Sequence, residues 1–201
     1  PNILEQMRDL DLLGMCIPTH YGGSGMDYVS LGLTCEELEY VDTSLRVIIS
    51  VHIALNSLSL LTWGSEEQRQ RYLVPQARGT RIASYGLTES SAGSDVRGMQ
   101  SVAVKQGDCW ILNGEKMWIS LADVADHFLI FAWTDQEKKQ RRDVSGMSAF
   151  IVERGFSGFS SGSLKEKWGI LAGNTGFLKF DDVEVPHSNM LGNEGEGFKI
   201  A

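Results

Sequence analysis

Cysteine and histidine are scarce in this chain, and neither forms a pattern. The 201 residues include three cysteines and four histidines, at positions 16, 35 and 109 and at positions 20, 52, 127 and 187. An odd number of separated cysteines argues against a disulfide framework and against zinc, and no histidine has a nucleophile partner for hydrolase chemistry. We therefore expect free thiols in a reducing compartment, structural histidines and no metal.

Basic residues are also fewer than acidic residues. Lysine and arginine total 18 against 26 acidic residues, which gives a net charge of -8. Such a chain has no wide basic surface for phosphates, so nucleic acid is not an expected partner. The basic run Lys138–Arg142 lies in the polar stretch 134–145, which we interpret as a solvated loop without an assigned function.

Long hydrophobic runs are missing as well. The most apolar stretch, Val47–Leu61, is interrupted by polar residues such as Ser50 and Asn56 and is shorter than the ~20 apolar residues of a membrane span. We expect no membrane-spanning segment. The chain opens without the charged and apolar stretches of a targeting leader.

The first part of the chain has a helical pattern. Apolar residues recur at helical spacing from Ile3 to Arg78, and Val47–Leu61 is apolar nearly all round, which predicts a buried helix. Ser65 and Gln68 have the spacing of a capping box and predict a helix start. These features indicate a helical domain over residues 1–79.

From Ile82 onward the hydrophobic period falls to two. Short alternating runs are expected as strands at 101–105, 109–112, 116–119, 127–133, 147–152 and 176–180. Asn113-Gly114 predicts a type I′ hairpin turn, since both turn positions need a positive φ. The fold class is therefore α+β, with an antiparallel β-barrel or sandwich over residues 80–190 after the helical domain. Residues 191–201 are expected to begin a further helical domain.

A loop of small residues follows the first expected strand. Tyr85-Gly86-Leu87-Thr88-Glu89 leads into Ser90-Ser91-Ala92-Gly93-Ser94-Asp95. The amides of such a loop can converge on an anion such as a pyrophosphate. Most small-residue turns after strands are only turns, so the loop alone decides nothing.

Several ordered motifs accompany this loop. They are Pro18-x-x-Tyr21-Gly22-Gly23, Gly64-Ser65-Glu66-Glu67-Gln68-Arg69-Gln70, the loop itself, Asn113-Gly114-x-Lys116-x-Trp118-Ile119-Ser120, Asp182-Val183-x-Val185-Pro186 and Leu191-Gly192-x-x-Gly195-x-Gly197-Phe198. The set spans nearly the whole chain and resembles the acyl-CoA dehydrogenase family. The second motif and the Tyr85–Glu89 segment most resemble its glutaryl-CoA dehydrogenase-like members.

The resemblance implies an FAD site. By the resemblance, the residues of this FAD site are Tyr85, Leu87, Thr88, Gly93, Ser94, Trp118, Ile119 and Ser120. The chemistry agrees, because the Thr88 and Ser120 hydroxyls can bond flavin heteroatoms and Trp118 offers a flat apolar surface. From periodicity alone Trp118 fits a core aromatic, and Ser94 fits a turn cap. Ser90 departs from the family's usual proline, while Ser120 replaces a commoner threonine and keeps the hydroxyl.

The resemblance also implies residues that bind substrate. Ser94 corresponds to a hydroxyl between the flavin pyrophosphate and the CoA thioester. Glu39 and Arg46 match positions that face the distal carboxylate in glutaryl-specific enzymes, and an arginine can bind a carboxylate through two hydrogen bonds. A surface arginine at a helix start is the alternative for Arg46, and Val47 departs from the polar residue expected beside it. The segment Lys167–Thr175 lacks the family's usual arginine and serine, so no CoA contact is assigned to it.

The implied reaction is FAD-dependent α,β-dehydrogenation of an acyl-CoA to a 2-enoyl-CoA, with electrons passed to an electron-transfer flavoprotein. The family's general base follows the β-domain, so no catalytic residue is expected here and the chain alone is expected to be an inactive fragment. Two alternatives remain, a flavin-dependent oxidase or monooxygenase and a non-catalytic FAD- or CoA-binding remnant. A homo-oligomer, tetramer or dimer, is expected, in a bacterial or archaeal cytoplasm or, alternatively, the mitochondrial matrix.

Overall fold

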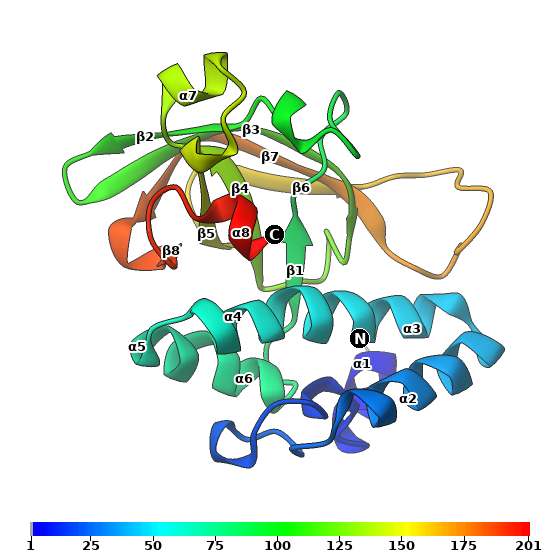
Figure 1. The fold of residues 1–201 in the computed structure, drawn as a ribbon. Helices are drawn as coiled ribbons and strands as arrows, with labels where there is room; N and C mark the ends of the chain where they lie inside the picture. The colour runs from blue at the N-terminus through cyan, green and yellow to red at the C-terminus, as the bar shows by residue number, and fades with distance from the viewer. Residues whose placement is uncertain (1) are drawn as a thin grey trace.

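Helices make up the first part of the chain. The computed structural model describes residues 2–201. The helices are α1 (Asn2–Asp9), α2 (Tyr28–Val41), α3 (Thr43–Ile49), α4 (Leu58–Trp63), α5 (Glu66–Gln68) and α6 (Val74–Ala77), with π-helical turns at Ser50–Ser57 and Arg69–Leu73 (Figure 1). Asp27 and Asp42 cap the starts of α2 and α3 with their carboxylates. Ser65 and Gln68 form the predicted capping box.

One continuous helix crosses the whole helical layer. It combines α3, the π-helical turn and α4, and runs for 21 residues from Thr43 to Trp63, longer than the predicted Val47–Leu61. Its length, and a mean hydropathy of 1.6 over its most apolar 18 residues, would suit a membrane span, but buried helices of soluble folds share these two properties. Here the helix buries Ile49, Ile53 and Leu60 in the core.

The strands form one sheet, which begins at Ala83. They are β1 (Ala83–Gly86), β2 (Val102–Gln106), β3 (Cys109–Ser120), β4 (His127–Trp133), β5 (Met147–Glu153), β6 (Phe159–Ser163), β7 (Thr175–Pro186) and β8 (Met190–Leu191). The order is β6-β7-β3-β2-β4-β5-β8, and β1 pairs with β4. Within residues 2–201 no strand precedes Ala83, as the change of period predicts.

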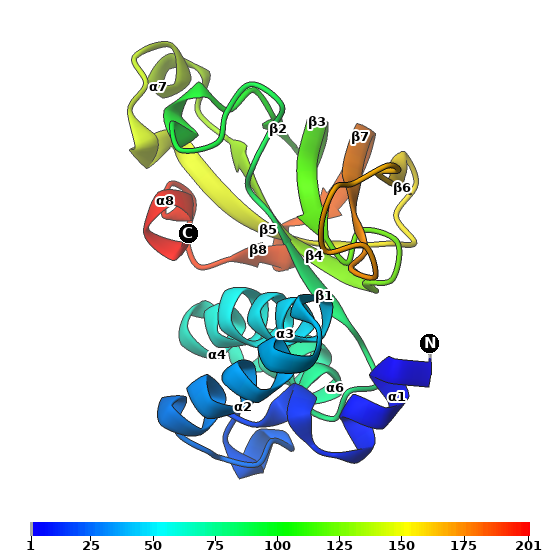
Figure 2. The same cartoon turned by 90° about the vertical axis from the view of Figure 1, so that its right-hand side faces the viewer.

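Antiparallel pairing dominates the sheet, as predicted. Only the pairs that β4 makes with β1 and with β2 are parallel. The sheet is open, because β6 and β8 end the order and do not pair with each other among the described residues. A closed barrel is therefore not formed. Figure 2 shows β1 rising from the helical layer into the sheet.

The Asn113-Gly114 pair is not a hairpin turn, and this prediction was wrong. Both residues lie inside β3, where the pairing with β7 shifts between Leu112 and Gly114. Asn113 is held by two hydrogen bonds with Asp182, of 2.8 and 2.9 Å. The φ of 140° at Gly114 belongs to this irregularity, and a side chain there would collide with Ser101. The real β2–β3 turn is Gly107-Asp108, since Gln106 pairs with Cys109.

Hydrophobic residues from both parts share a core. Met7 and Ile49 from the helices belong to one cluster with Trp110, Phe128 and Phe150 from the sheet.

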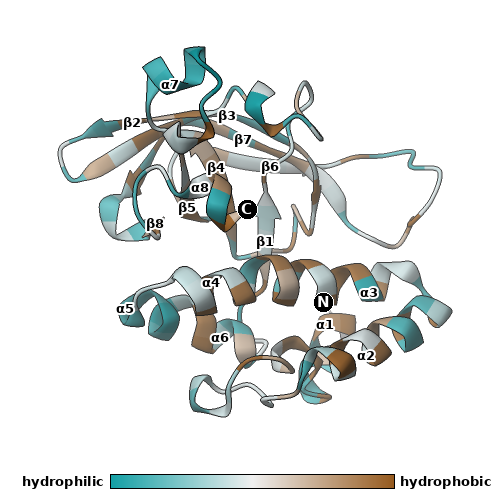
Figure 3. Cartoon of the chain, viewed as in Figure 1, coloured by the Kyte–Doolittle hydropathy of each residue, from teal (hydrophilic) through white to brown (hydrophobic). Residues whose placement is uncertain are grey.

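Figure 3 shows hydrophobic segments along β4 and hydrophilic residues over α7 (Gln136–Gln140). The basic run expected as a loop is thus partly a short helix with no buried residue. The last helix, α8 (Gly197–Ile200), packs Ile200 into a second cluster. The division at residues 79 and 190 stays a prediction.

A buried polar network joins the long helix to β1. The His52 Nδ1 atom accepts a hydrogen bond from the Ala83 amide at 3.0 Å, and its Nε2 lies 3.2 Å from the Gln76 carbonyl. The Gln76 side chain contacts Asn56 at 2.9 Å and the ring of His127 at 2.5 Å. Burial lowers the pKa of His52 to about 4 and that of His127 to about 3. Both rings are therefore neutral near pH 7, and the His52 ring holds the start of β1 in place.

This network predicts acid sensitivity. Between pH 6.5 and 4 the unfolded chain binds protons on these histidines and the native state does not, so stability falls as the pH decreases. From pH 6.5 to 5 the loss is about 2 kcal/mol per histidine. Urea unfolding at several pH values should show this decrease in the free energy of unfolding with falling pH. In His52→Gln the slope of free energy against pH should be smaller. A matched control is His20→Gln, which replaces an exposed histidine instead of a buried one. Equal slopes in all three proteins would contradict the prediction.

Candidate functional site

Predicted site residues lie at the end of β1 and in the loop of residues 87–95 that follows it, here called the β1 loop. Tyr85 is half-buried, and its ring lies 5.1 Å from that of Phe131. Burial raises the pKa of Tyr85 to about 12, so the phenol stays protonated. The next position must be small, because a side chain at Gly86 would lie 2.7 Å from Ile130. The close packing of β1 thus fixes the position at which Leu87 and Thr88 leave the sheet.

The loop then closes on itself. Glu89 and Ala92 exchange two backbone hydrogen bonds of 3.0 and 3.1 Å. Beyond this bridge Gly93 and Ser94 are exposed. Nothing lies within 4 Å of a side chain built at Gly93, so the loop has open space on this side. The predicted small-residue loop is therefore a constrained turn whose outer edge is free.

Trp118 lies in a bulge near the end of β3. The pairing with β7 shifts between Met117 and Ile119, and the φ of Trp118 is 63°. A bulky residue rarely adopts this conformation, which costs about 1–3 kcal/mol and concentrates at functional sites. The bulge redirects the indole outward, where 63% of the residue is exposed. Its interpretation as a core aromatic is therefore wrong. Ile119 is only 3% exposed, so a ligand could meet its backbone but not its side chain.

The β1 loop and the end of β3 lie side by side. The Met117 amide donates to the Thr88 carbonyl at 2.9 Å, and the Ser84 hydroxyl donates to the Ser120 carbonyl at 2.6 Å. The structure therefore brings together the β1 loop and the Trp118–Ser120 segment. Within residues 2–201, no protein group hydrogen-bonds the hydroxyls of Thr88, Ser94 or Ser120. These three hydroxyls remain available to a ligand.

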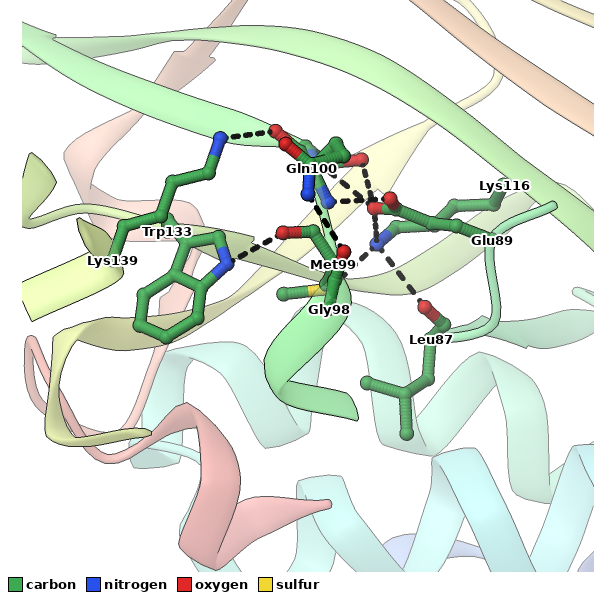
Figure 4. Close-up of polar contacts among 9 residues, drawn as sticks. Leu87, Glu89, Gly98, Met99, Gln100, Lys116, Trp133 and Lys139 are labelled. Atoms are coloured by element: carbon green, nitrogen blue, oxygen red, sulfur yellow. Dashed lines mark hydrogen bonds and ion pairs between the residues drawn. The ribbon is translucent and has the colours of Figure 1, made fainter. Parts of the chain in front are cut away.

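A buried ion pair underlies the loop, and sequence reasoning missed its role. Lys116 Nζ lies 2.8 Å from a carboxylate oxygen of Glu89, and the two side chains are 0% and 5% exposed (Figure 4). Burial opposes ionisation of Glu89, but Lys116 holds its pKa below the usual value. Burial lowers the pKa of Lys116, and Glu89 opposes this effect. The available signal was the alternation of β3, which places Lys116 on the same inward face as Trp110 and Leu112.

Glu39 and Arg46 lie together on the helical layer. Arg46 Nε donates to Glu39 at 2.7 Å, and Thr43 donates to the same carboxylate at 2.7 Å. The Arg46 hydrogen bond holds the pKa of Glu39 below its usual value. These contacts stay within α2 and α3, and no hydrogen bond joins either residue to the β1 loop within the described part of the chain. Their role in substrate binding stays a prediction.

An apolar cavity of about 360 Å³ lies where the long helix meets the segment after Ser120. Its lining includes Leu45, Val47, Ile48, Leu121 and Val124. Ser44 also lines it, and the buried hydroxyl of that serine has no hydrogen-bond partner among the described residues. The cavity can accept an apolar group with one hydrogen-bond acceptor.

Comparison with protein families matches both parts of the chain. Residues 1–80 match the model of the acyl-CoA dehydrogenase N-terminal domain, and residues 84–183 match that of the middle domain. The chain belongs to the acyl-CoA dehydrogenase family. The helical layer and open sheet are therefore the N-terminal and middle domains of this family.

Individual relatives support this assignment. A short-chain specific acyl-CoA dehydrogenase of Clostridium acetobutylicum is 44% identical over 198 residues, which are 98% of this chain and 51% of that protein. The butyryl-CoA dehydrogenase structure of Megasphaera elsdenii is 38% identical with a TM-score of 0.94, covering 99% of this chain and 52% of its own. A glutaryl-CoA dehydrogenase of Mycobacterium smegmatis in complex with FADH2 is 35% identical with a TM-score of 0.90, covering 99% and 49%. The chain spans about half the length of these relatives.

Proposed function

We propose that these residues form the flavin-binding part of an FAD-dependent acyl-CoA dehydrogenase. The protein that contains them is proposed to convert an acyl-CoA to a 2-enoyl-CoA and to pass the electrons to an electron-transfer flavoprotein. One observation carries the proposal: in a chain of this family, an exposed tryptophan in a strained bulge lies beside hydroxyls that have no hydrogen-bond partner among residues 2–201. Assembly as a homo-oligomer is part of the proposal and is tested by sedimentation.

The residues present fit FAD. The Trp118 indole offers a flat apolar face, and the Thr88 and Ser120 hydroxyls can bond heteroatoms at the edge of a ring. Ser94, on the free edge of the loop, can contact a pyrophosphate. Tyr85, Leu87, Gly93 and Ile119 would contribute backbone and packing contacts. FAD, when bound, supplies the acceptor for the hydride that leaves the substrate's β carbon.

The proton at the α carbon needs a general base, and we propose that this base lies outside residues 1–201. A base must come within hydrogen-bond reach of the proton that it removes. In the β1 loop, Glu89 is engaged by Lys116 and Asp95 by Arg142. Both carboxylates are paired with basic side chains, which supports a base supplied by another segment.

The proposed substrate is a short-chain acyl-CoA. The cavity beside the long helix has an apolar lining and only a modest volume, which suits a short acyl chain. A chain with a distal carboxylate remains within the proposal, because Arg46 uses Nε for Glu39 and can still offer other guanidinium donors.

Arg46→Ala tests recognition of a distal carboxylate. We expect kcat/KM for glutaryl-CoA to fall about tenfold and that for butyryl-CoA to change little, since hydrogen bonds to charged groups contribute about 1.5–3 kcal/mol. Arg71→Ala is a matched control, because Arg71 also pairs with a glutamate, Glu153, at 2.7 Å. Equal changes for both substrates would mean that Arg46 does not bind the carboxylate.

The overall function is tested on the complete gene product. The purified protein should carry FAD, and anaerobic butyryl-CoA should bleach the flavin absorption. Reoxidation should be slow in air and fast with an electron-transfer flavoprotein. Rapid reoxidation by oxygen would indicate an oxidase or monooxygenase instead. FAD binding without bleaching by any acyl-CoA would indicate a non-catalytic remnant.

A further inference from the structure

The buried pair of Lys116 and Glu89 connects every segment of the proposed flavin site. Besides Glu89, Lys116 Nζ contacts the Leu87 carbonyl at 3.2 Å and the Met99 sulfur at 2.9 Å. Lys116 itself stands on β3, two residues before Trp118. One ammonium group therefore links the β1 loop, the strand of the bulge and the segment that follows the loop.

Glu89 extends these connections. Its carboxylate accepts from the Ser101 amide at 3.0 Å, from the Ser101 hydroxyl at 2.6 Å and from the Gln100 amide. The Met99 carbonyl in turn accepts from the Trp133 indole at 2.8 Å, which anchors the segment to β4. The pair is thus held by partners from several segments, among them Leu87, Met99 and Gln100 (Figure 4).

The contact with Leu87 has a direct consequence for Thr88. The Leu87 carbonyl and the Thr88 amide belong to one planar peptide group, so fixing the oxygen also fixes the N–H, which points the opposite way. The next peptide group is fixed as well, because the Thr88 carbonyl accepts from Met117 at 2.9 Å. Lys116 and the β3 backbone therefore set both peptide groups that flank Thr88.

Stability alone does not explain such a pair. Burying two charges carries a large desolvation cost, and apolar residues of similar volume often serve a core equally well. A buried lysine that reaches a loop carbonyl does something that an apolar residue cannot do, which is to orient a peptide group.

We propose that Lys116 and Glu89 are positioning residues for the flavin, which orient the Thr88 amide and hydroxyl and hold the β1 loop against the Trp118 bulge. This inference rests on the proposed function. The pair is buried and has no direct contact with the ligand, so it acts through Leu87 and Thr88. Its removal therefore changes how FAD is held, beyond any change in folding.

The experiment uses the complete gene product and separates the effect of the pair on folding stability from its effect on how FAD is held. Lys116→Met leaves an unpaired buried carboxylate and should lower the melting temperature. Adding Glu89→Gln restores neutrality, so the double variant should fold and regain most of the thermal stability. Gln68→Ala is the control. It removes a partly buried hydrogen bond to Ser188 of 2.9 Å and a buried one to Met190 of 2.7 Å, on a helix that contributes no residue to the proposed flavin site.

The two readouts are the Kd for FAD and the visible circular dichroism of bound flavin. Both are measured at a temperature where all variants are folded. The double variant should bind FAD about tenfold more weakly and with an altered spectrum, while Gln68→Ala keeps both. Recovery of affinity and spectrum together with stability in the double variant would overturn the inference alone. Failure of the unaltered protein to bind FAD would overturn the proposed function and this inference with it.

Discussion

Trp118→Ala is expected to weaken the binding of FAD strongly while leaving the folding of the protein nearly intact. In most proteins the loss of a tryptophan destabilises the core, but here the side chain is 63% exposed and makes little packing contact. A flavin that covers one indole face would remove about 100 Å² of apolar surface from water, which is worth about 2–3 kcal/mol. The affinity for FAD should therefore fall by roughly 50-fold.

Trp118→Gly sharpens this prediction. The φ of 63° strains tryptophan but not glycine, so the glycine variant should be more stable than the unaltered apoprotein by about 1 kcal/mol. It should still lose FAD. The measurements are the flavin-to-protein absorbance ratio after gel filtration and the melting temperature of each apoprotein. Full flavin occupancy with an unchanged spectrum in the alanine variant would show that Trp118 does not contact FAD.

A polypeptide restricted to residues 1–201 is expected to be catalytically inert toward acyl-CoA, even with excess FAD. General-base assistance contributes about 100- to 10,000-fold to proton transfer, and Glu89 and Asp95 are already engaged in ion pairs. Glu39, on the helical layer, is bonded to Arg46. We therefore propose that none of these three carboxylates acts as the base.

The same polypeptide should also associate. Helix α2 has no buried residue, although Leu33, Tyr40 and Val41 are large and apolar, and Leu55 of the long helix is 40% exposed. Exposed apolar surface of this kind favours self-association. The test mixes the polypeptide with FAD, butyryl-CoA and an artificial electron acceptor and follows flavin bleaching, with sedimentation as the second readout. Turnover close to that of the complete gene product would mean that a base lies within these residues.

Local sequence patterns were sufficient to predict much of the fold. The change of hydrophobic period near residue 79 matches the end of α6 at Ala77 and the start of β1 at Ala83. The capping box at Ser65 depends on residues three apart, and its geometry is set by the helix itself. The resemblance of motifs was enough to identify the family. These properties depend on neighbouring residues or on motif order, so they can be recognised without knowing which strands pair.

Other features depended on partners distant in sequence. Asn113-Gly114 favours a hairpin turn locally, but bonds from Asn113 to Asp182 and the pairing of β3 with β7 keep it within a strand. The exposure of Trp118 results from a bulge that exists only against β7. Neither outcome has a signal in the adjacent residues, because the competing interaction comes from more than fifty positions away.

By itself, the sequence determined the family and the change from helices to strands near residue 79. Tertiary structure alone decided that Lys116 meets Glu89, that Trp118 faces outward and that His52 holds β1. The physical reason lies in how each kind of information is encoded. Periodicity and capping follow from local backbone geometry, whereas the partner of a buried charge or ring is chosen by packing between segments that meet only in the folded chain.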